Sequence, residues 1–177
     1  MAEAGAGIRR AAAGDVAAVA EVTAAAYRPY VPVIGVEPAP MRAEHAADVA
    51  AGLVWVTGEP VHGVLVLVAH RDHLLLASVA VRPEAHGRGV GGRLIAFAQE
   101  RARALGLPEV RLYTHELMGE NRSRYRRLGF EETGRSRSGP YRRVHFRKRV
   151  VDTPGAGGVT GAGGAPPGAD GAAPDVR

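Results

Sequence analysis

Cysteine is absent from this 177-residue chain, which excludes disulfide bonds, cysteine nucleophiles and thiolate metal ligands. The seven histidines show no H-E-x-x-H or comparable spacing, so we expect no metal site. No apolar run approaches the roughly 20 residues that a membrane-spanning helix needs. The N-terminal segment MAEAGAGIRRAAAGD also lacks the apolar core of a signal peptide. We therefore expect a cytoplasmic protein that does not enter a membrane.

Lysine is nearly absent too, because Lys148 is the single lysine among 23 basic residues. Ten arginines and Lys148 lie between Arg122 and Arg149, against only Glu131 and Glu132. Such a basic end is compatible with nucleic acid, an acidic membrane surface or a phosphorylated small molecule. Aromatic residues that would stack on bases are sparse in this region, so nucleic acid is the least favoured of these partners.

The C-terminal segment 153–177 consists largely of glycine, alanine and proline and has almost no large apolar side chains. It cannot bury enough surface to offset the entropy of ordering, so we predict a disordered tail. Residues 1–152 then form one domain of ordinary size.

That domain alternates between helical and extended patterns, which predicts an α/β fold. Helices are predicted over 16–27, 41–52, 90–105 and 119–129, and a proline-rich loop over 28–40. Strands are predicted over 7–12, 53–58, 61–69, 73–81, 109–115, 129–135 and 141–150. The strand, helix and strand between residues 74 and 114 should form a right-handed crossover with parallel strands. The predicted buried face of the 90–105 helix is Val90, Leu94, Phe97, Ala98, Ala102 and Leu105.

A glycine-rich segment, HGRGVGG, spans residues 86–92 at the start of this helix. Its four glycines are Gly87, Gly89, Gly91 and Gly92. Unpaired backbone N–H groups and the positive end of the helix dipole point out of a helix start, and glycine lets an anion approach them. The segment therefore predicts a phosphate or pyrophosphate site, flanked by Arg88 and Arg93. The alternative is a tight turn in which glycine lets helix and strand pack closely.

The spacing Gly87, Gly89, Gly92 also satisfies the G-x-G-x-x-G dinucleotide fingerprint. Five residues separate the strand from Gly87, however, and no acidic residue ends the next strand. No Gly-Lys-Ser/Thr sequence exists for a Walker-type loop. Nicotinamide and nucleoside triphosphate sites are therefore disfavoured.

The segment VAVRPEAHGRGVGGRLI resembles motif A of the GNAT superfamily of acyl-CoA-dependent N-acetyltransferases, and LYTHELMGENRSRYRRLGF resembles its motif B. The resemblance extends over residues 8–151. It implies the GNAT fold, in which a mixed, mostly antiparallel sheet is flanked by helices and carries a parallel strand–helix–strand unit at the glycine loop. It also implies transfer of an acetyl group from acetyl-CoA to an amine, without a metal.

The resemblance assigns the coenzyme to two segments. The backbone of Val79, Ala80 and Val81 would pair with the pantetheine arm, and Asn121 would hydrogen-bond it further along. The pyrophosphate would be bound by the N–H groups of the glycine loop and by nearby basic side chains. This loop set comprises His86, Gly87, Arg88, Gly89, Val90, Gly91, Gly92 and Arg93. His86 stands where relatives usually carry Gln or Arg.

For catalysis, the resemblance implies direct attack of the amine on the thioester in a ternary complex. Tyr125 would protonate the departing thiolate, although its position also suits core packing. The N–H of Val79 or Ala80 would stabilise the oxyanion. Some relatives carry a carboxylate where this chain has Ala77 and Ser78, so the base is open between Glu116, His115 and a water chain.

The acceptor pocket is expected between the loop 27–41 and the last two strands. Its expected lining is Tyr27, Tyr30 and Tyr141, with Arg135 or Arg142 attracting an acidic group. The acceptor would be a primary amine of a small molecule or of a protein, and relatives suggest a homodimer through the late strands. The alternatives are a non-catalytic acyl-CoA sensor with the same fold and a basic nucleic-acid-binding module.

Overall fold

The computed structural model describes residues 7–151, so the predicted tail lies outside the described residues. The helices are α1 (Val16–Tyr27), α2 (Val31–Ile34), α3 (His45–Ala50), α4 (Val90–Ala104) and α5 (Gly119–Arg127). The strands are β1 (Arg9–Arg10), β2 (Val54–Thr57), β3 (Gly63–Ala69), β4 (Leu74–Val81), β5 (Glu109–His115), β6 (Glu131–Ser138) and β7 (Tyr141–Arg149). A short 3₁₀ turn, η3 (Ala39–Arg42), precedes α3.

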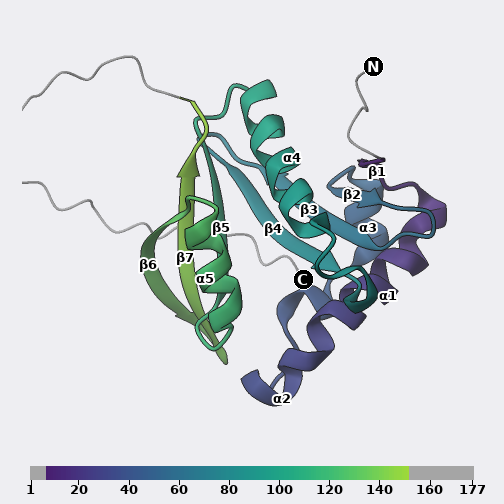
Figure 1. Cartoon of the computed structure of the whole chain (residues 1–177), viewed down its shortest axis with the longest axis horizontal. Coiled ribbons are helices and arrows are strands. Elements are labelled where there is room, and N and C mark those ends of the chain that lie inside the picture. Colours follow the sequence, from purple (N-terminus) through teal and green to yellow (C-terminus); the bar gives the residue numbers. More distant parts are fainter. Residues whose placement is uncertain (1–6, 152–177) are drawn as a thin grey trace, which may run out of the picture.

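The strands form one sheet in the order β1-β2-β3-β4-β5-β7-β6, with helices on both faces (Figure 1). Only the neighbours β4 and β5 are parallel, and every other described pair is antiparallel. One apolar cluster lies under α4 and includes Leu94 and Ile95, and a second lies under α1 and includes Val19 and Val22. The predicted α/β class, the mixed sheet and the parallel unit at the glycine loop are confirmed.

A β-bulge interrupts β4 at Ala77. Val66 of β3 pairs with Ser78, whereas its neighbour Leu67 pairs with Leu76, so Ala77 is an extra residue on β4. The bulge reverses the alternation of side chains along the strand. Leu76 packs into the α4 cluster, whereas Ala80, four positions later, packs into the α1 cluster. An unbroken strand would have placed both on the same face.

Beyond the bulge, β4 and β5 separate. Their pairing is limited to Leu74–Leu76 with Val110–Leu112, and β5 continues beside β7 while β4 turns away (Figure 1). Residues 77–81 therefore have β3 on one side and no strand on the other. The bulge and the separation together create an opening in the middle of the sheet.

Some sequence predictions of the elements were wrong in detail. The loop 28–40 contains α2 and the start of η3, and the helix predicted over 41–52 is reduced to α3. Leu105 was predicted to be buried but is 47% exposed, since it follows the end of α4 at Ala104. Ile95 is buried, although the predicted buried face did not include it. None of the helices within residues 7–151 combines the length and apolar character needed to cross a bilayer.

Candidate active site

Two cavities meet in the opening between β4 and β5. The first, here the α1-side cavity, is bounded by α1, the residues around η3, α3 and the ends of β5 and β7. The second, here the α4-side cavity, is bounded by α1, α5 and the start of α4. Residues that line both cavities are Tyr27, Val79, Met118, Asn121 and Tyr125. Two molecules that enter from opposite faces of the sheet can therefore meet at these residues.

The four glycines of the loop do not share one explanation. Gly87 and Gly89 have φ angles of 76° and 73°, so the turn itself favours glycine there. Gly91 and Gly92 lie in the first turn of α4, where glycine weakens a helix. A Cβ at Gly92 would meet nothing within 4 Å, and one at Gly91 would make only ordinary contacts at 3.6 and 3.8 Å. Internal packing therefore does not require glycine at these two positions.

The start of α4 is electrostatically suited to an anion. The helical hydrogen bonding begins with the Arg93 N–H donating to the Gly89 carbonyl at 3.0 Å, so the preceding amides have no partner within the helix. Arg93 also donates through Nη1 to the Arg88 carbonyl at 3.0 Å, which fixes the loop. Arg88 itself is exposed.

Arg124 is a further cation at this point that sequence reasoning missed. It belongs to α5, lines the α4-side cavity and has Nη1 3.6 Å from the Cβ position of Gly91. None of the described carboxylates forms an ion pair with it. Its position one helical turn after Glu120 gave no sign of proximity to the glycine loop, because α5 and α4 are distant in sequence.

The open edge of β4 presents alternate backbone groups. The Arg82 N–H donates to the His62 carbonyl at 2.8 Å, on the β3 side. Because backbone direction alternates along a strand, the groups of Ala80 also face β3, whereas those of Val79 and Val81 face the opening. Of the three residues predicted to pair with the pantetheine arm, only Val79 and Val81 have this orientation.

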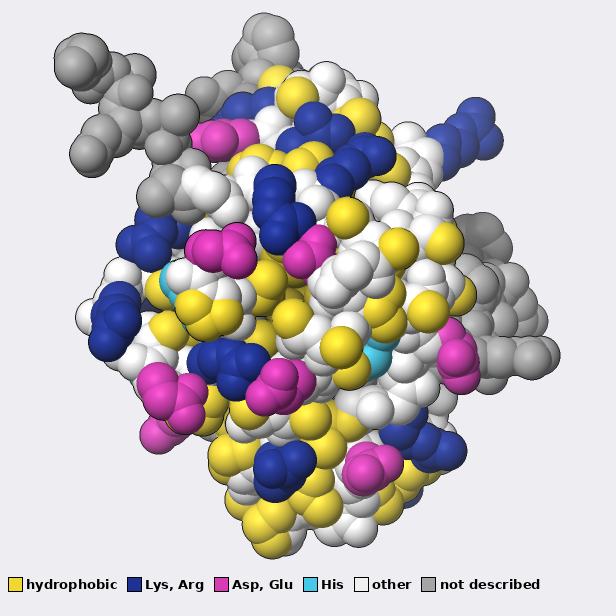
Figure 2. Space-filling model, turned by 90° about the vertical axis from the view of Figure 1, so that its right-hand side faces the viewer, with side chains coloured by type: hydrophobic (Ala, Val, Ile, Leu, Met, Phe, Trp, Pro, Cys, Tyr) yellow, Lys and Arg dark blue, Asp and Glu magenta, His cyan; other side chains and the backbone are white. Residues whose placement is uncertain are grey.

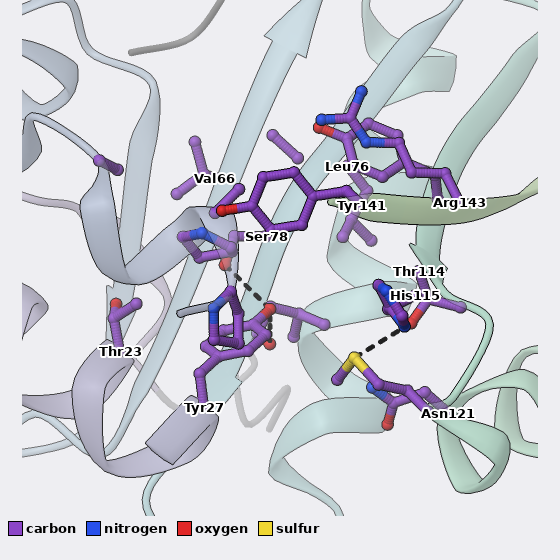
Figure 3. A pocket seen from close by; sticks show the side chains of 18 of the residues that line it. Thr23, Tyr27, Val66, Leu76, Ser78, Thr114, His115, Asn121, Tyr141 and Arg143 are labelled. Atoms are coloured by element: carbon purple, nitrogen blue, oxygen red, sulfur yellow. Dashed lines mark hydrogen bonds between the residues drawn. The ribbon is translucent and has the colours of Figure 1, made fainter. Parts of the chain in front are cut away.

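The carbonyl groups at this edge already have partners. The Tyr27 hydroxyl donates to the Val79 carbonyl at 3.2 Å, and it lies 3.2 Å from Ser78 Oγ (Figure 3). His86 Nε2 lies 3.1 Å from the Val81 carbonyl, which draws the glycine loop back onto the strand. The N–H groups of Val79 and Val81 are left facing the opening.

Tyr125 lies where the two cavities join. Its side chain is 6% exposed, and its ring packs against Phe130 and Phe146 with centroid distances of 5.9 and 5.8 Å. None of the described residues hydrogen-bonds its hydroxyl, and burial raises the pKa of Tyr125 above its ordinary value. Asn121, one helical turn earlier on α5, lines the same junction (Figure 3). The predicted pair therefore shares one site, and Tyr125 both packs in the core and offers a neutral hydroxyl.

The two candidate bases are placed differently relative to this pair. Glu116 lines neither cavity, and its Oε1 accepts a hydrogen bond from Arg142 Nη1 at 2.7 Å, which lowers the pKa of the carboxyl group. His115 lines the α1-side cavity, but its Nδ1 accepts from the Leu117 N–H at 3.2 Å. The neutral ring then carries its proton on Nε2, and burial lowers the pKa of His115. Glu116 therefore lies outside both cavities, and the basic nitrogen of the neutral His115 ring is already occupied.

The residues expected to line an acceptor pocket are divided between the two cavities. Tyr27 and Tyr141 line the α1-side cavity, and the Tyr141 hydroxyl donates to the Glu37 carbonyl at 2.8 Å, which ties the segment before η3 to β7. Tyr30 lines the other cavity. Arg135 lines neither cavity and is paired with a glutamate.

The basic end of the chain is partly neutralised by ion pairs. Arg126 and Arg135 both contact Glu132, at 2.7 and 3.0 Å, and Arg142 is held by Glu116. On the face seen in Figure 2, basic and acidic side chains are interspersed among apolar ones. Residues 7–151 contain no group of three or more acidic or histidine side chains that could hold a metal ion.

Comparisons with known proteins identify relatives. A family model described as "Acetyltransferase (GNAT) domain" matches residues 50–132. A mycothiol acetyltransferase from Rhodococcus opacus (strain B4) is 38% identical over 60 residues, which are 34% of this chain and 18% of that protein. The chain thus matches less than a fifth of that relative's length.

Two solved structures share the fold. The PaiA N-acetyltransferase from Thermoplasma acidophilum, solved in complex with coenzyme A, has a TM-score of 0.67 at 18% identity, covering 78% of this chain and 96% of that one. The ribosomal-protein-S18-alanine N-acetyltransferase from Escherichia coli has a TM-score of 0.65 at 14% identity, covering 82% and 94%.

Proposed function

We propose that this chain, whose residues 50–132 match a GNAT acetyltransferase domain, transfers an acetyl group from acetyl-CoA to a primary amine of a small molecule or a protein. The observation that carries this proposal is the junction of the two cavities at Val79, Asn121 and Tyr125. The coenzyme would enter from the α4 side and the amine from the α1 side. A ternary complex is then the natural arrangement, because each substrate has its own entrance.

The coenzyme would be held by charge and by backbone pairing. Its pyrophosphate would lie against the amides at the start of α4, where the missing side chains of Gly91 and Gly92 leave room. Arg124 would supply charge-assisted hydrogen bonds, alongside Arg88 and Arg93. A coenzyme complex of a structural relative supports this use of the fold.

The pantetheine arm would continue along the open edge of β4, as an added strand does. Because Tyr27 and His86 occupy the carbonyls of Val79 and Val81, the arm would bond to the Val81 N–H, which leaves the Val79 N–H for the thioester oxygen. The Val79 N–H is the proposed oxyanion donor, since it faces the junction and the groups of Ala80 do not. Asn121 would bond the arm from the opposite side.

In the transfer step, the amine nitrogen would attack the thioester carbon, the carbon–sulfur bond would break, and the amine would lose a proton. Tyr125 would stabilise the departing thiolate. A thiol with an ordinary pKa near 8.5 is a stronger acid than this buried phenol. We therefore propose that Tyr125 donates a hydrogen bond that strengthens as charge develops on sulfur, and that the sulfur leaves as a thiolate, which takes up a proton from solvent. A water chain in the α1-side cavity would remove the amine proton.

The test is release of CoA thiol from acetyl-CoA in the presence of a panel of amines, with mass spectrometry of the acceptors. The proposal expects amine-dependent release and an acceptor heavier by one acetyl group. A second candidate is a non-catalytic acyl-CoA sensor, favoured by the engagement of Glu116 and His115 elsewhere. A sensor would bind the coenzyme but would release no CoA thiol with any amine of the panel.

A further inference from the structure

Asp48 stands out among the residues of the α1-side cavity. Of the described residues that line this cavity, it is the one with a carboxylate. It belongs to α3 and is partly buried, and no described group hydrogen-bonds or ion-pairs with its side chain. His45, one turn earlier on α3, also lines the cavity, and its Nδ1 is buried without a hydrogen-bond partner among residues 7–151. The Asp48 carboxylate and His45 Nδ1 on this wall are therefore available to a ligand.

An unpaired carboxylate in this position is costly. The neighbouring lining includes apolar residues such as Pro38, Pro40 and Val66. Burial raises the pKa of Asp48, which reflects the loss of water around its charged form. A cation placed against the carboxylate would offset that loss, because buried charges are stabilised when they are paired.

Charged side chains of opposite sign also lie on different walls of the cavity. On the far side, Arg143 of β7 also lines it, with its guanidinium carbon 4.5 Å from the centroid of the Tyr113 ring. Thr23 of α1 and Arg143 lie on opposite sides of the cavity in Figure 3, and α3 packs against α1. The α3 wall thus carries the Asp48 carboxylate beside His45, and the β7 wall carries the Arg143 guanidinium. A cationic group would be repelled from Arg143 and drawn toward Asp48.

We propose that Asp48 binds a second positive charge of the acceptor, remote from the amine that is acetylated. This inference rests on the proposed function, since it names the substrate class of the same site. The reacting amine belongs near Tyr125 and Asn121 on α5, whereas Asp48 lies on the wall formed by α3. The preferred acceptor is therefore an amine with an additional ammonium or guanidinium group and an apolar spacer.

Matched ligands test the proposal by equilibrium binding. Calorimetry in the presence of CoA compares linear diamines of four to eight carbons with monoamines of the same length. The wild-type protein should bind the best diamine at least about tenfold more tightly than its monoamine, as expected for one charge-assisted contact. Asp48→Asn keeps the shape and should abolish this preference without changing CoA affinity. Glu100→Gln removes a charge from an exposed position on α4, outside both cavities, and should leave the preference intact.

The proposal is overturned if the wild-type protein binds the two ligand series equally, if no diamine binds, or if Asp48→Asn retains the preference. Acetyl transfer is measured separately with the same amines. A charge preference in binding without transfer would refute the proposed function and leave the role of Asp48 intact. Transfer to monoamines and diamines with equal kcat/KM and equal affinity would refute the role of Asp48 and leave the proposed function intact.

Discussion

Replacing Tyr125 with phenylalanine separates catalysis from stability. The ring contacts with Phe130 and Phe146 survive the change, and no hydrogen bond within residues 7–151 is lost. Removing an unpaired hydroxyl from a site that is 6% exposed should leave the free energy of unfolding unchanged or raise it by up to about 1 kcal/mol. In the reaction, the variant loses a hydrogen bond to a developing thiolate, and such bonds to charged groups contribute about 1.5–3 kcal/mol.

That loss corresponds to a fall in kcat of roughly 10- to 150-fold, at about 1.4 kcal/mol per factor of ten. The assay is thiol release at saturating acetyl-CoA, with CoA affinity from calorimetry and the melting temperature measured on the same preparations. CoA affinity should change less than about twofold, since the phenol is not assigned to coenzyme binding. An unchanged kcat would remove Tyr125 from the mechanism. A lower melting temperature together with weaker CoA binding would show that its role is structural.

Three further substitutions probe other parts of the structure. Arg124→Gln should weaken CoA binding about tenfold in calorimetry, and the difference should shrink at high salt because the cation beside the glycine loop is lost. Tyr141→Phe should raise the KM of the amine about two- to tenfold and leave that of acetyl-CoA unchanged, because it frees the Glu37 carbonyl. Hydrogen bonding from Arg9 lowers the pKa of Asp15 to about 2. Asp15 therefore stabilises the fold above its unfolded pKa near 3.9, and Asp15→Asn should lower the melting temperature much more at pH 7 than at pH 2, where the folded carboxyl group is half protonated.

Each of these has a matched control or a contrary result. Arg127→Gln removes the same charge from an exposed position on α5 that lines neither cavity, so equal losses in the two variants would indicate a general charge effect. An effect of Tyr141→Phe on acetyl-CoA rather than on the amine would contradict the assignment of the two cavities. Equal destabilisation by Asp15→Asn at both pH values would show that the carboxylate's charge is not what stabilises the fold.

Local patterns in the sequence were sufficient for most elements of the fold. The alternation of apolar residues and the Gly106 stop predicted α4 and β5 closely, because each signal acts within a few residues. The bulge at Ala77 was not predicted. LLLASVAV contains no glycine or proline, and the extra residue is evident only from the register with β3. The opening between β4 and β5 therefore could not be derived from the residue pattern itself.

The residues of the candidate site were likewise only partly predictable from the sequence. Tyr125 and Asn121 are four residues apart on one helix, so their proximity followed from helical geometry alone. Arg124 and Asp48 were missed because their roles depend on neighbours from distant elements, the start of α4 for one and the end of β5 for the other. Glu116 was favoured as a base because of its place after β5, but Arg142, 26 residues later, engages its carboxylate.

The central claim is that the start of α4 and the open edge of β4 bind the coenzyme, and calorimetry of CoA with Gly91→Leu tests it most directly. The wild-type protein should give saturable heat for one site. The variant should melt at the same or a higher temperature, since leucine is the better helix former, yet bind CoA at least about tenfold more weakly. Ala96→Leu, an exposed change of similar size on α4, should bind CoA normally. No heat from the wild-type protein at millimolar CoA, or full affinity in Gly91→Leu, would contradict the claim.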